Sequence, residues 1–199
     1  MKHLLYALPL MALLTSCFVN RPDYYLSGAN REFQKEAVQK NWLVIFNNFS
    51  SSAEQEVKNQ IIIDFKTALS GKTEFQSDFL NFDNEAAAGK LLTAREIAEI
   101  EAESAADYVA VFSVQIKYQT SDKVIEIRKE KVEKYRNMFV FLNVYDAKTK
   151  DNIYSKYAVS QLKTGDSADS PVQTGIKTQA LKTYEKLKKD FFKVLTAGK

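Results

Sequence analysis

Few side chains in this chain of 199 residues could do covalent or metal chemistry. Cys17 is the only cysteine and His3 is the only histidine. One thiol and one imidazole cannot form a disulfide within the chain or a zinc site made of cysteine and histidine ligands. Six glycines stand far apart, so neither a Walker-type phosphate loop nor a dinucleotide-binding fingerprint can be assembled. The remaining candidates are carboxylates, of which Asp107 and Asp146 stand at predicted strand ends.

The first 16 residues have the pattern of a signal peptide. Lys2 supplies a positive charge, and Leu4–Leu14 is an apolar run too short to cross a bilayer as a permanent helix. The segment Leu14-Thr15-Ser16-Cys17 then resembles the lipobox of bacterial lipoproteins. That resemblance implies a diacylglyceryl group on the Cys17 thiol and cleavage of the chain just before it. The alternatives are an ordinary secretory signal with an incidental cysteine, or a short anchor helix.

Lipidation at Cys17 would place the protein in the cell envelope. Residues 17–30 are polar and irregular, so they are predicted to form a lipidated tether that reaches at most about 45 Å. Phe18, rather than aspartate, follows the cysteine, which under the sorting rule of enteric bacteria implies the outer membrane. The domain would then face the periplasm. Cleavage also removes His3, leaving no Ser-His-Asp or Cys-His pair in the mature chain.

Residues 31–199 are predicted to form a single α/β domain. The apolar content of 45% is ordinary for a globular protein. Of the 28 Lys and Arg residues only Lys2 leaves with the signal peptide, so the mature chain has 27 basic residues against 25 acidic ones. This near-balance gives no reason to expect a nucleic-acid partner. No cofactor or metal is implied.

Apolar patterns and capping motifs outline the domain. Trp42–Phe46 is a continuous apolar run, typical of a strand covered on both faces. Ser51 with Glu54 and Thr93 with Glu96 form capping boxes, each of which predicts a helix start. The predicted elements are a short helix in Arg31–Lys40, a strand at Trp42–Phe46, a helix at Ala53–Leu69, an edge strand in Thr73–Phe82, a helix from Thr93 to about Ser104, a strand at Ala106–Tyr118, a hairpin of Met138–Asp146 and Ile153–Leu162, and a helix from Pro171 to about Leu195.

This order predicts an α/β (α+β) fold with a mixed sheet. The sheet has a parallel start and an antiparallel C-terminal hairpin, helices pack on it, and the last helix is long. The strand at Ala106–Tyr118 is expected to lie beside the strand at Trp42–Phe46. For Lys123–Arg136, both a helix and a solvated strand stay open.

Two segments resemble the CsgG-like family of curli secretion channels and the TolB amino-terminal domain. They are Ala98–Val114, which contains Ala106-Asp107-Tyr108-Val109, and Val140–Thr149, where a strand ends in a turn and returns. The similarity covers roughly residues 40–195. Lys150 departs from the pattern, because the family turn usually has glycine there.

The CsgG-like resemblance makes an oligomeric outer-membrane secretion or pore component an alternative function. The segment best placed for a transmembrane hairpin is Lys123–Arg136, which has charged residues on both alternating faces. Each cation near the bilayer midplane costs a strand roughly 2 to 4 kcal/mol. We therefore expect that this segment does not insert.

The leading hypothesis is a non-catalytic envelope lipoprotein whose domain binds another protein or assembles with itself. The candidate contact residues are Tyr145, Tyr154, Tyr157, Arg128 and Arg136. Tyrosine is enriched in interfaces, but these tyrosines could instead pack on the sheet, and the charged segment could be a solvated surface. A hydrolase that uses Asp107 or Asp146 is the other alternative, although turn and cap roles would also explain both residues.

Overall fold

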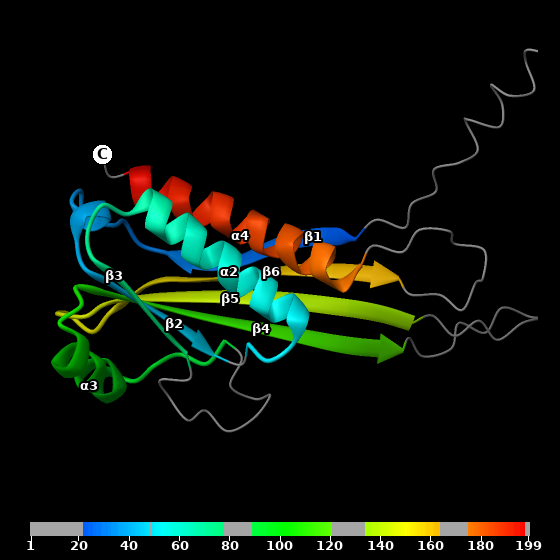
Figure 1. Ribbon diagram of the computed structural model, residues 1–199, viewed down its shortest axis with the longest axis horizontal. Helices are drawn as coiled ribbons and strands as arrows, with labels where there is room; N and C mark the ends of the chain where they lie inside the picture. The colour runs from blue at the N-terminus through cyan, green and yellow to red at the C-terminus, as the bar shows by residue number, and fades with distance from the viewer. Residues whose placement is uncertain (1–21, 48, 78–88, 121–133, 164–174, 198–199) are drawn as a thin grey trace, which may run out of the picture.

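A six-stranded mixed sheet with helices on both faces forms the domain (Figure 1). The computed structural model describes residues 22–47, 49–77, 89–120, 134–163 and 175–197. Its strands, in the order β1-β6-β5-β4-β2-β3, are β1 (Asp23–Asn30), β2 (Trp42–Asn47), β3 (Thr73–Ser77), β4 (Tyr108–Thr120), β5 (Lys134–Asp146) and β6 (Asn152–Lys163). Its helices are the 3₁₀ turn η1 (Ala37–Gln39), α2 (Ser52–Ala68), α3 (Ala94–Ser104) and α4 (Ile176–Ala197).

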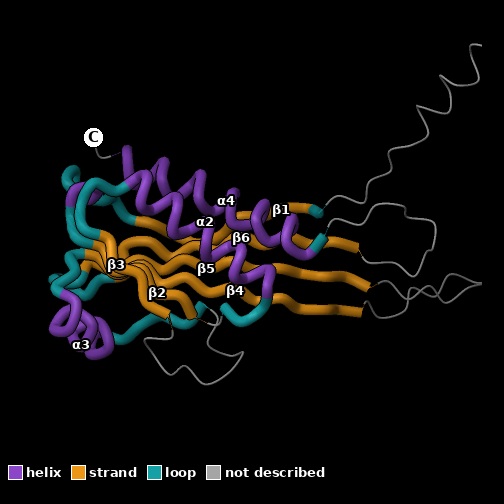
Figure 2. Tube along the Cα trace, viewed as in Figure 1, coloured by secondary structure: helices purple, strands orange, loops and turns teal. Residues whose placement is uncertain are grey.

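The pairing confirms the predicted sheet. β2 pairs in parallel with both β3 and β4, whereas β4–β5, β5–β6 and β6–β1 are antiparallel. In the sheet, β3 and β4 lie on opposite sides of β2. The connection from β2 to β3 and the connection from β3 to β4 therefore cross the sheet in opposite directions. Because parallel crossovers are right-handed, their helices must lie on opposite faces of the sheet. Accordingly, α2 and α4 lie side by side on one face and α3 lies on the other (Figure 2).

Capping boxes mark the starts of helices α2 and α3. The Ser51 hydroxyl accepts a hydrogen bond from the backbone N–H of Glu54, and the Glu54 carboxylate accepts one from the backbone N–H of Ser51. Thr93 and Glu96 form the same reciprocal pair at the start of α3. Both capping boxes satisfy backbone N–H groups that a helix start leaves unpaired. Both predicted capping boxes are thus confirmed.

β2 is buried on both faces, as its apolar run predicts. Trp42, Val44 and Phe46 point into the larger core under α2 and α4, whereas Leu43 and Ile45 point into a smaller core under α3. Trp42 stacks on Tyr108 with ring centroids 4.8 Å apart, and its Nε1–H donates to the Ala37 carbonyl oxygen. The central strand therefore joins both layers to the sheet.

The main difference from the sequence prediction lies at the start of the domain. Residues 17–30 were expected to be a tether, but Asp23–Asn30 form β1, an edge strand paired with β6 along its whole length. The folded domain therefore includes Asp23–Asn30, which were assigned to the tether from the sequence. The segment escaped prediction because its ladder partner lies about 130 residues later and seven of its eight residues are exposed.

Smaller differences concern two helices. The expected helix in Arg31–Lys40 is a single 3₁₀ turn, Ala37–Gln39. α4 begins at Ile176 rather than at Pro171, and Pro171 lies outside the described residues. Of Lys123–Arg136, only residues 134–136 are described, and they belong to β5.

Candidate functional site

The predicted lipidation segment Leu14-Thr15-Ser16-Cys17 lies outside the described residues. The described chain starts with Pro22, which is buried, and β1 follows at once. Five residues thus separate Cys17 from the first strand. At about 3.3 to 3.6 Å per residue, the step from Cys17 to Asp23 spans at most about 22 Å. Any group attached to Cys17 is therefore held close to the β1 edge.

Asp107 and Asp146 lie at the same end of the sheet, where Tyr108 pairs with Asp146. Asp107 Oδ2 accepts a 3.0 Å hydrogen bond from the Asn41 N–H. Asp146 Oδ1 accepts hydrogen bonds of 3.0 Å each from the N–H groups of Lys148 and Thr149. These contacts hold the β2 entrance and the β5–β6 turn in place. Both carboxylates thus have the turn and cap geometry that the sequence also allowed.

Two of the three tyrosines expected at a partner interface are core residues. Tyr145 is 1% exposed, lies under α3, and its hydroxyl accepts a 2.8 Å hydrogen bond from the Leu92 N–H. Tyr154 is fully buried on the opposite face, where its hydroxyl donates to Asp190. The prediction that these two side chains contact a partner is wrong. Their strands are covered by a helix at these positions, and burial with a hydroxyl partner accounts for both.

Tyr157 lies on a different part of the sheet. On the α3 side it pairs across β5 with Phe141, and its ring lies 5.5 Å from that of Phe141 and 6.5 Å from that of Phe139. These three rings are half-buried, and we call them the aromatic cluster. Among the described residues no helix covers it; the backbone at Gly89 lies close to Phe141, and Lys117 Nζ lies 6.0 Å from the centre of the Phe139 ring. Of the tyrosines named from the sequence, Tyr157 alone belongs to a partly exposed surface.

Arg128 and Arg136 are the two arginines predicted to contact a partner. Arg128 lies outside the described residues. Arg136 is 9% exposed, and its Nε–H donates a 2.7 Å hydrogen bond to Gln179 Oε1 on α4. Burial lowers the pKa of the Arg136 guanidinium. Gln179 also donates to Ser160, whose hydroxyl bonds to that of Thr183, so Arg136 belongs to a buried polar network that fixes α4 on the sheet.

Two carboxylates each bind a buried tyrosine and a lysine at the borders of α4, and neither set of contacts could be identified from the sequence. Asp190 accepts from the Tyr154 hydroxyl at 2.8 Å and from Lys156 Nζ at 2.7 Å. On α2, Asp64 accepts from the Tyr184 hydroxyl at 2.9 Å and from Lys188 Nζ at 2.8 Å. Burial, reinforced by the neighbouring carboxylate, raises the pKa of both tyrosines. These contacts join α4 to β6 and to α2.

The exposed face of α4 carries a row of lysines. Lys182, Lys186, Lys189 and Lys193 recur at helical spacing and all four are exposed. We call this row the lysine stripe. Glu185 lies beside it, and Lys189 Nζ binds its carboxylate at 3.0 Å, which lowers the pKa of Glu185. The sequence shows this spacing, but it does not show which side of the helix faces solvent.

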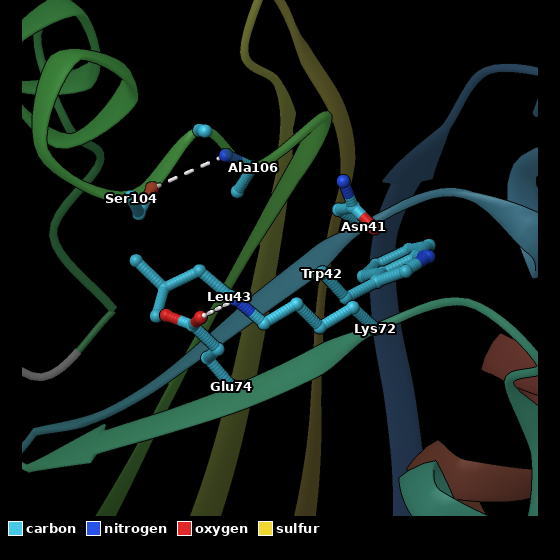
Figure 3. Close-up of a pocket in the computed structure, with 8 residues that line it drawn as sticks. Asn41, Trp42, Leu43, Lys72, Glu74, Ser104 and Ala106 are labelled. Atoms are coloured by element: carbon cyan, nitrogen blue, oxygen red, sulfur yellow. Dashed lines mark hydrogen bonds and ion pairs between the residues drawn. The ribbon is translucent and has the colours of Figure 1, made fainter.

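A small pocket lies at the amino ends of β2 and β3, beside the end of α3 (Figure 3). Its volume is about 60 Å³, and the side chains of Lys72 and Glu74, which form an ion pair, lie at its mouth. That volume holds about two water molecules, not an organic substrate. Within the described ranges there is no cluster of three or more residues fit to hold a metal ion. No described helix is long and apolar enough to cross a membrane.

No protein-family model matches the chain, and no curated protein matches it. Solved structures of similar fold include the PelC dodecamer from Paraburkholderia phytofirmans, at 11% identity and a TM-score of 0.41, covering 88% of this chain and 96% of that one. A Helicobacter pylori protein named as a neuraminyllactose-binding hemagglutinin homolog has 15% identity and a TM-score of 0.45, covering 85% and 88%. Lipoprotein GNA1162 from Neisseria meningitidis has 12% identity and a TM-score of 0.36, covering 65% and 88%.

Lipoproteins are thus among the solved structures that this chain resembles. At these low identities and TM-scores, no functional argument rests on them. The resemblance to the CsgG-like and TolB families remains a prediction.

Proposed function

We propose that the chain is a non-catalytic lipoprotein of the cell envelope, anchored through an acylated Cys17, whose domain binds another envelope protein. The observation that carries the proposal is the spacing between the lipobox-like segment and β1. A cysteine positioned for acylation stands six residues before the first described strand of a folded domain. Acyl chains contribute roughly 0.8 kcal/mol per buried CH₂, so more than one chain gives stable attachment without a membrane-spanning helix.

The aromatic cluster is the surface best suited to a protein partner. Phe139, Phe141 and Tyr157 are half-buried rings on a sheet face that also carries Val159, Gln115 and Asn137. Rigid aromatic side chains provide contact area at a low cost in conformational entropy, and interfaces concentrate them for that reason. A protein surface that buries these three rings would complete the face of the sheet that α3 leaves open.

The described residues offer weaker support for the alternatives. Asp107 and Asp146 accept hydrogen bonds from backbone N–H groups, and the pocket lined by Asn41 and Ala106, next to Asp107, is too small for an organic substrate. A self-assembling secretion or pore component would use the same surfaces but with a second copy as partner. Its distinguishing property is a large and stable homo-oligomer.

A crosslinking pull-down from the native envelope tests the proposal. The bait is the acylated protein, with Tyr157→Ala as the surface variant and Tyr25→Ala, which changes an exposed tyrosine on edge strand β1, as its matched control. Because Tyr25 lies on the same sheet face as the aromatic cluster, a second control is Tyr118→Ala, at an exposed tyrosine on the opposite face. We expect one reproducible partner that is lost with Tyr157→Ala and kept with Tyr118→Ala, and a monomeric domain by native mass measurement. A homo-oligomer with no second protein would favour assembly, and a partner kept by all variants would exclude the aromatic cluster.

A further inference from the structure

Besides the aromatic cluster, the domain has a second exposed surface with a distinct chemical character, the lysine stripe of α4. Lys182 and Lys193 are eleven residues apart, so the stripe extends for about 16 Å along the helix. The core side of the same helix carries Tyr184, Leu187 and Phe191, which are buried. The four lysines therefore lie on the side of the helix opposite its core residues, with Lys186 leaning over the Tyr24 ring at the β1 edge. The carboxylates next to the stripe on α4 are Glu185 and Asp190, and Asp190 is paired with Lys156.

The stripe lies next to the point where the chain leaves the domain toward Cys17. Lys186 Nζ lies 5.9 Å from the centre of the Tyr24 ring, and Tyr24 is only seven residues from Cys17. Seven residues span at most about 25 Å when fully extended. If Cys17 is acylated, the lipid headgroups at the anchor lie within about this distance of Tyr24, the residue whose ring Lys186 approaches.

The β1 edge adds an apolar border to the stripe. Leu26 pairs with Ala158 and so faces the α4 side of the sheet, where it is 41% exposed. Tyr25, on the opposite side of the same strand, is 59% exposed. Between β1 and the stripe lies a shallow hollow lined by Tyr24, Glu185 and three of the stripe's lysines. Amphipathic tyrosines and lysines of this kind are typical of surfaces that meet lipid headgroups.

We infer that the lysine stripe and the β1 edge dock the domain flat on an anionic lipid bilayer. This inference rests on the proposed lipid anchor, which brings the surface to the membrane but does not orient it. Each lysine near an anionic surface favours the docked state by roughly fivefold. Four lysines, even with Glu185 partly offsetting them, are enough to select one orientation of an already tethered domain. The aromatic cluster, on the opposite face of the sheet, would then point away from the lipid.

The test uses the full acylated protein in vesicles that contain a headgroup-labelled quencher lipid. A fluorophore on Thr196→Cys reports the far end of the stripe face, about 30 Å along α4 from its first residue. The same fluorophore on Glu103→Cys reports α3 on the opposite face. Both positions are exposed. With phosphatidylglycerol in the vesicles, we expect several-fold stronger quenching at residue 196 than at residue 103.

Charge variants then show whether the stripe causes that difference. Replacing Lys182, Lys186, Lys189 and Lys193 by glutamine should abolish it, as should high salt or vesicles of phosphatidylcholine alone. The matched control replaces four exposed lysines elsewhere by glutamine, namely Lys35, Lys66, Lys72 and Lys148, and should keep it. An unchanged thermal unfolding curve verifies that both variants fold.

The possible failures are distinguishable. Equal quenching at the two reporters in protein that floats with the vesicles would overturn the docking inference and leave the anchor intact. The inference would also be overturned if the fluorescence change at residue 196 depended on protein concentration and not on lipid charge. That result would indicate that the lysine stripe binds an acidic protein surface instead of lipid. Protein that floats with no vesicle and lacks an acyl mass would overturn the proposed anchor itself, and docking with it.

Discussion

The Tyr154 hydroxyl of β6 donates a 2.8 Å hydrogen bond to Oδ2 of Asp190 on α4. Lys156 Nζ binds the same oxygen at 2.7 Å, and its side chain is only 13% exposed. One carboxylate therefore satisfies two groups that the sheet and α4 enclose, and it holds the C-terminal helix in register on the sheet.

Removing that carboxylate should destabilise the domain. In Asp190→Ala, the Tyr154 hydroxyl and the Lys156 ammonium lose their acceptor while they remain largely buried. We expect a loss of about 2 to 4 kcal/mol in the free energy of unfolding, measured by urea denaturation. Glu185→Ala, which removes an exposed carboxylate of the same helix, should change it by no more than about 0.5 kcal/mol. Equal effects of the two variants would contradict this role of Asp190.

Tyr108 should make stability depend on pH in the alkaline range. Burial, reinforced by the nearby carboxylates of Asp146 and Asp107, raises the pKa of Tyr108 to about 12. In the unfolded chain a tyrosine loses its proton near pH 10. Between about pH 10 and 12 the folded state thus binds more protons, so stability that is fully present below pH 10 falls by up to about 1.4 kcal/mol per pH unit.

Urea denaturation at several pH values above 10 checks this expectation. Tyr108→Phe should reduce the slope of stability against pH by that contribution. Tyr118→Phe, which changes a side chain that is 70% exposed, should leave the slope as in the wild type. A wild-type slope in Tyr108→Phe would rule out this residue as the source.

Lys150 has a left-handed backbone, with φ at +62°. This is the turn position where the resembling families usually have glycine, and the structure shows that lysine adopts the conformation glycine would favour. Because a side chain is strained there, Lys150→Gly should stabilise the domain by about 0.5 to 1 kcal/mol, even though glycine makes the unfolded chain more flexible. Lys148→Gly, in the same turn but without a positive φ, should not stabilise it. Thermal unfolding of the two variants measures the difference.

Gly28 is required for β1 to lie against β6. Its φ is +122°, and a Cβ atom there would lie 2.2 Å from the Ser155 carbonyl oxygen. Gly28→Ala should therefore cost about 2 kcal/mol or more, or release β1 from the sheet. Loss of hydrogen-exchange protection at the paired amides of β6 would identify release. Ser27→Ala, at the preceding exposed position, is the control and should keep both stability and protection.

Much of the fold follows from local sequence signals. The capping boxes at Ser51 and Thr93 and the apolar run of β2 predict their elements because the deciding contacts lie within a few residues. β1 could not be found in this way, because it is an edge strand whose stability comes from pairing with β6 and from α4. Strand alternation can separate the two faces of β5 and β6 but does not show which stretches the helices cover. For that reason the sequence left open whether Tyr145 and Tyr154 contact a partner or pack on the sheet, and the structure shows that both pack in the core.

The candidate surfaces were predicted only in part. Tyr157 was named from the sequence, whereas its neighbours Phe139 and Phe141 appeared only as strand residues. The lysine stripe follows a helical spacing visible in the sequence, but six lysines are spread over α4, and only packing against the core shows which four face solvent together. The Asp64 and Asp190 contacts join residues far apart in the chain, so no local pattern could indicate them.

The most direct test of the proposed envelope lipoprotein is the intact mass of the protein isolated from its native membrane. We expect a chain that begins at Cys17 and carries the added mass of acyl chains on that residue. Cys17→Ser should retain residues 1–16 and lack the added mass. A mature chain cut at another position, or one that begins at Cys17 without acyl groups, would show that the protein is not a lipoprotein anchored at Cys17.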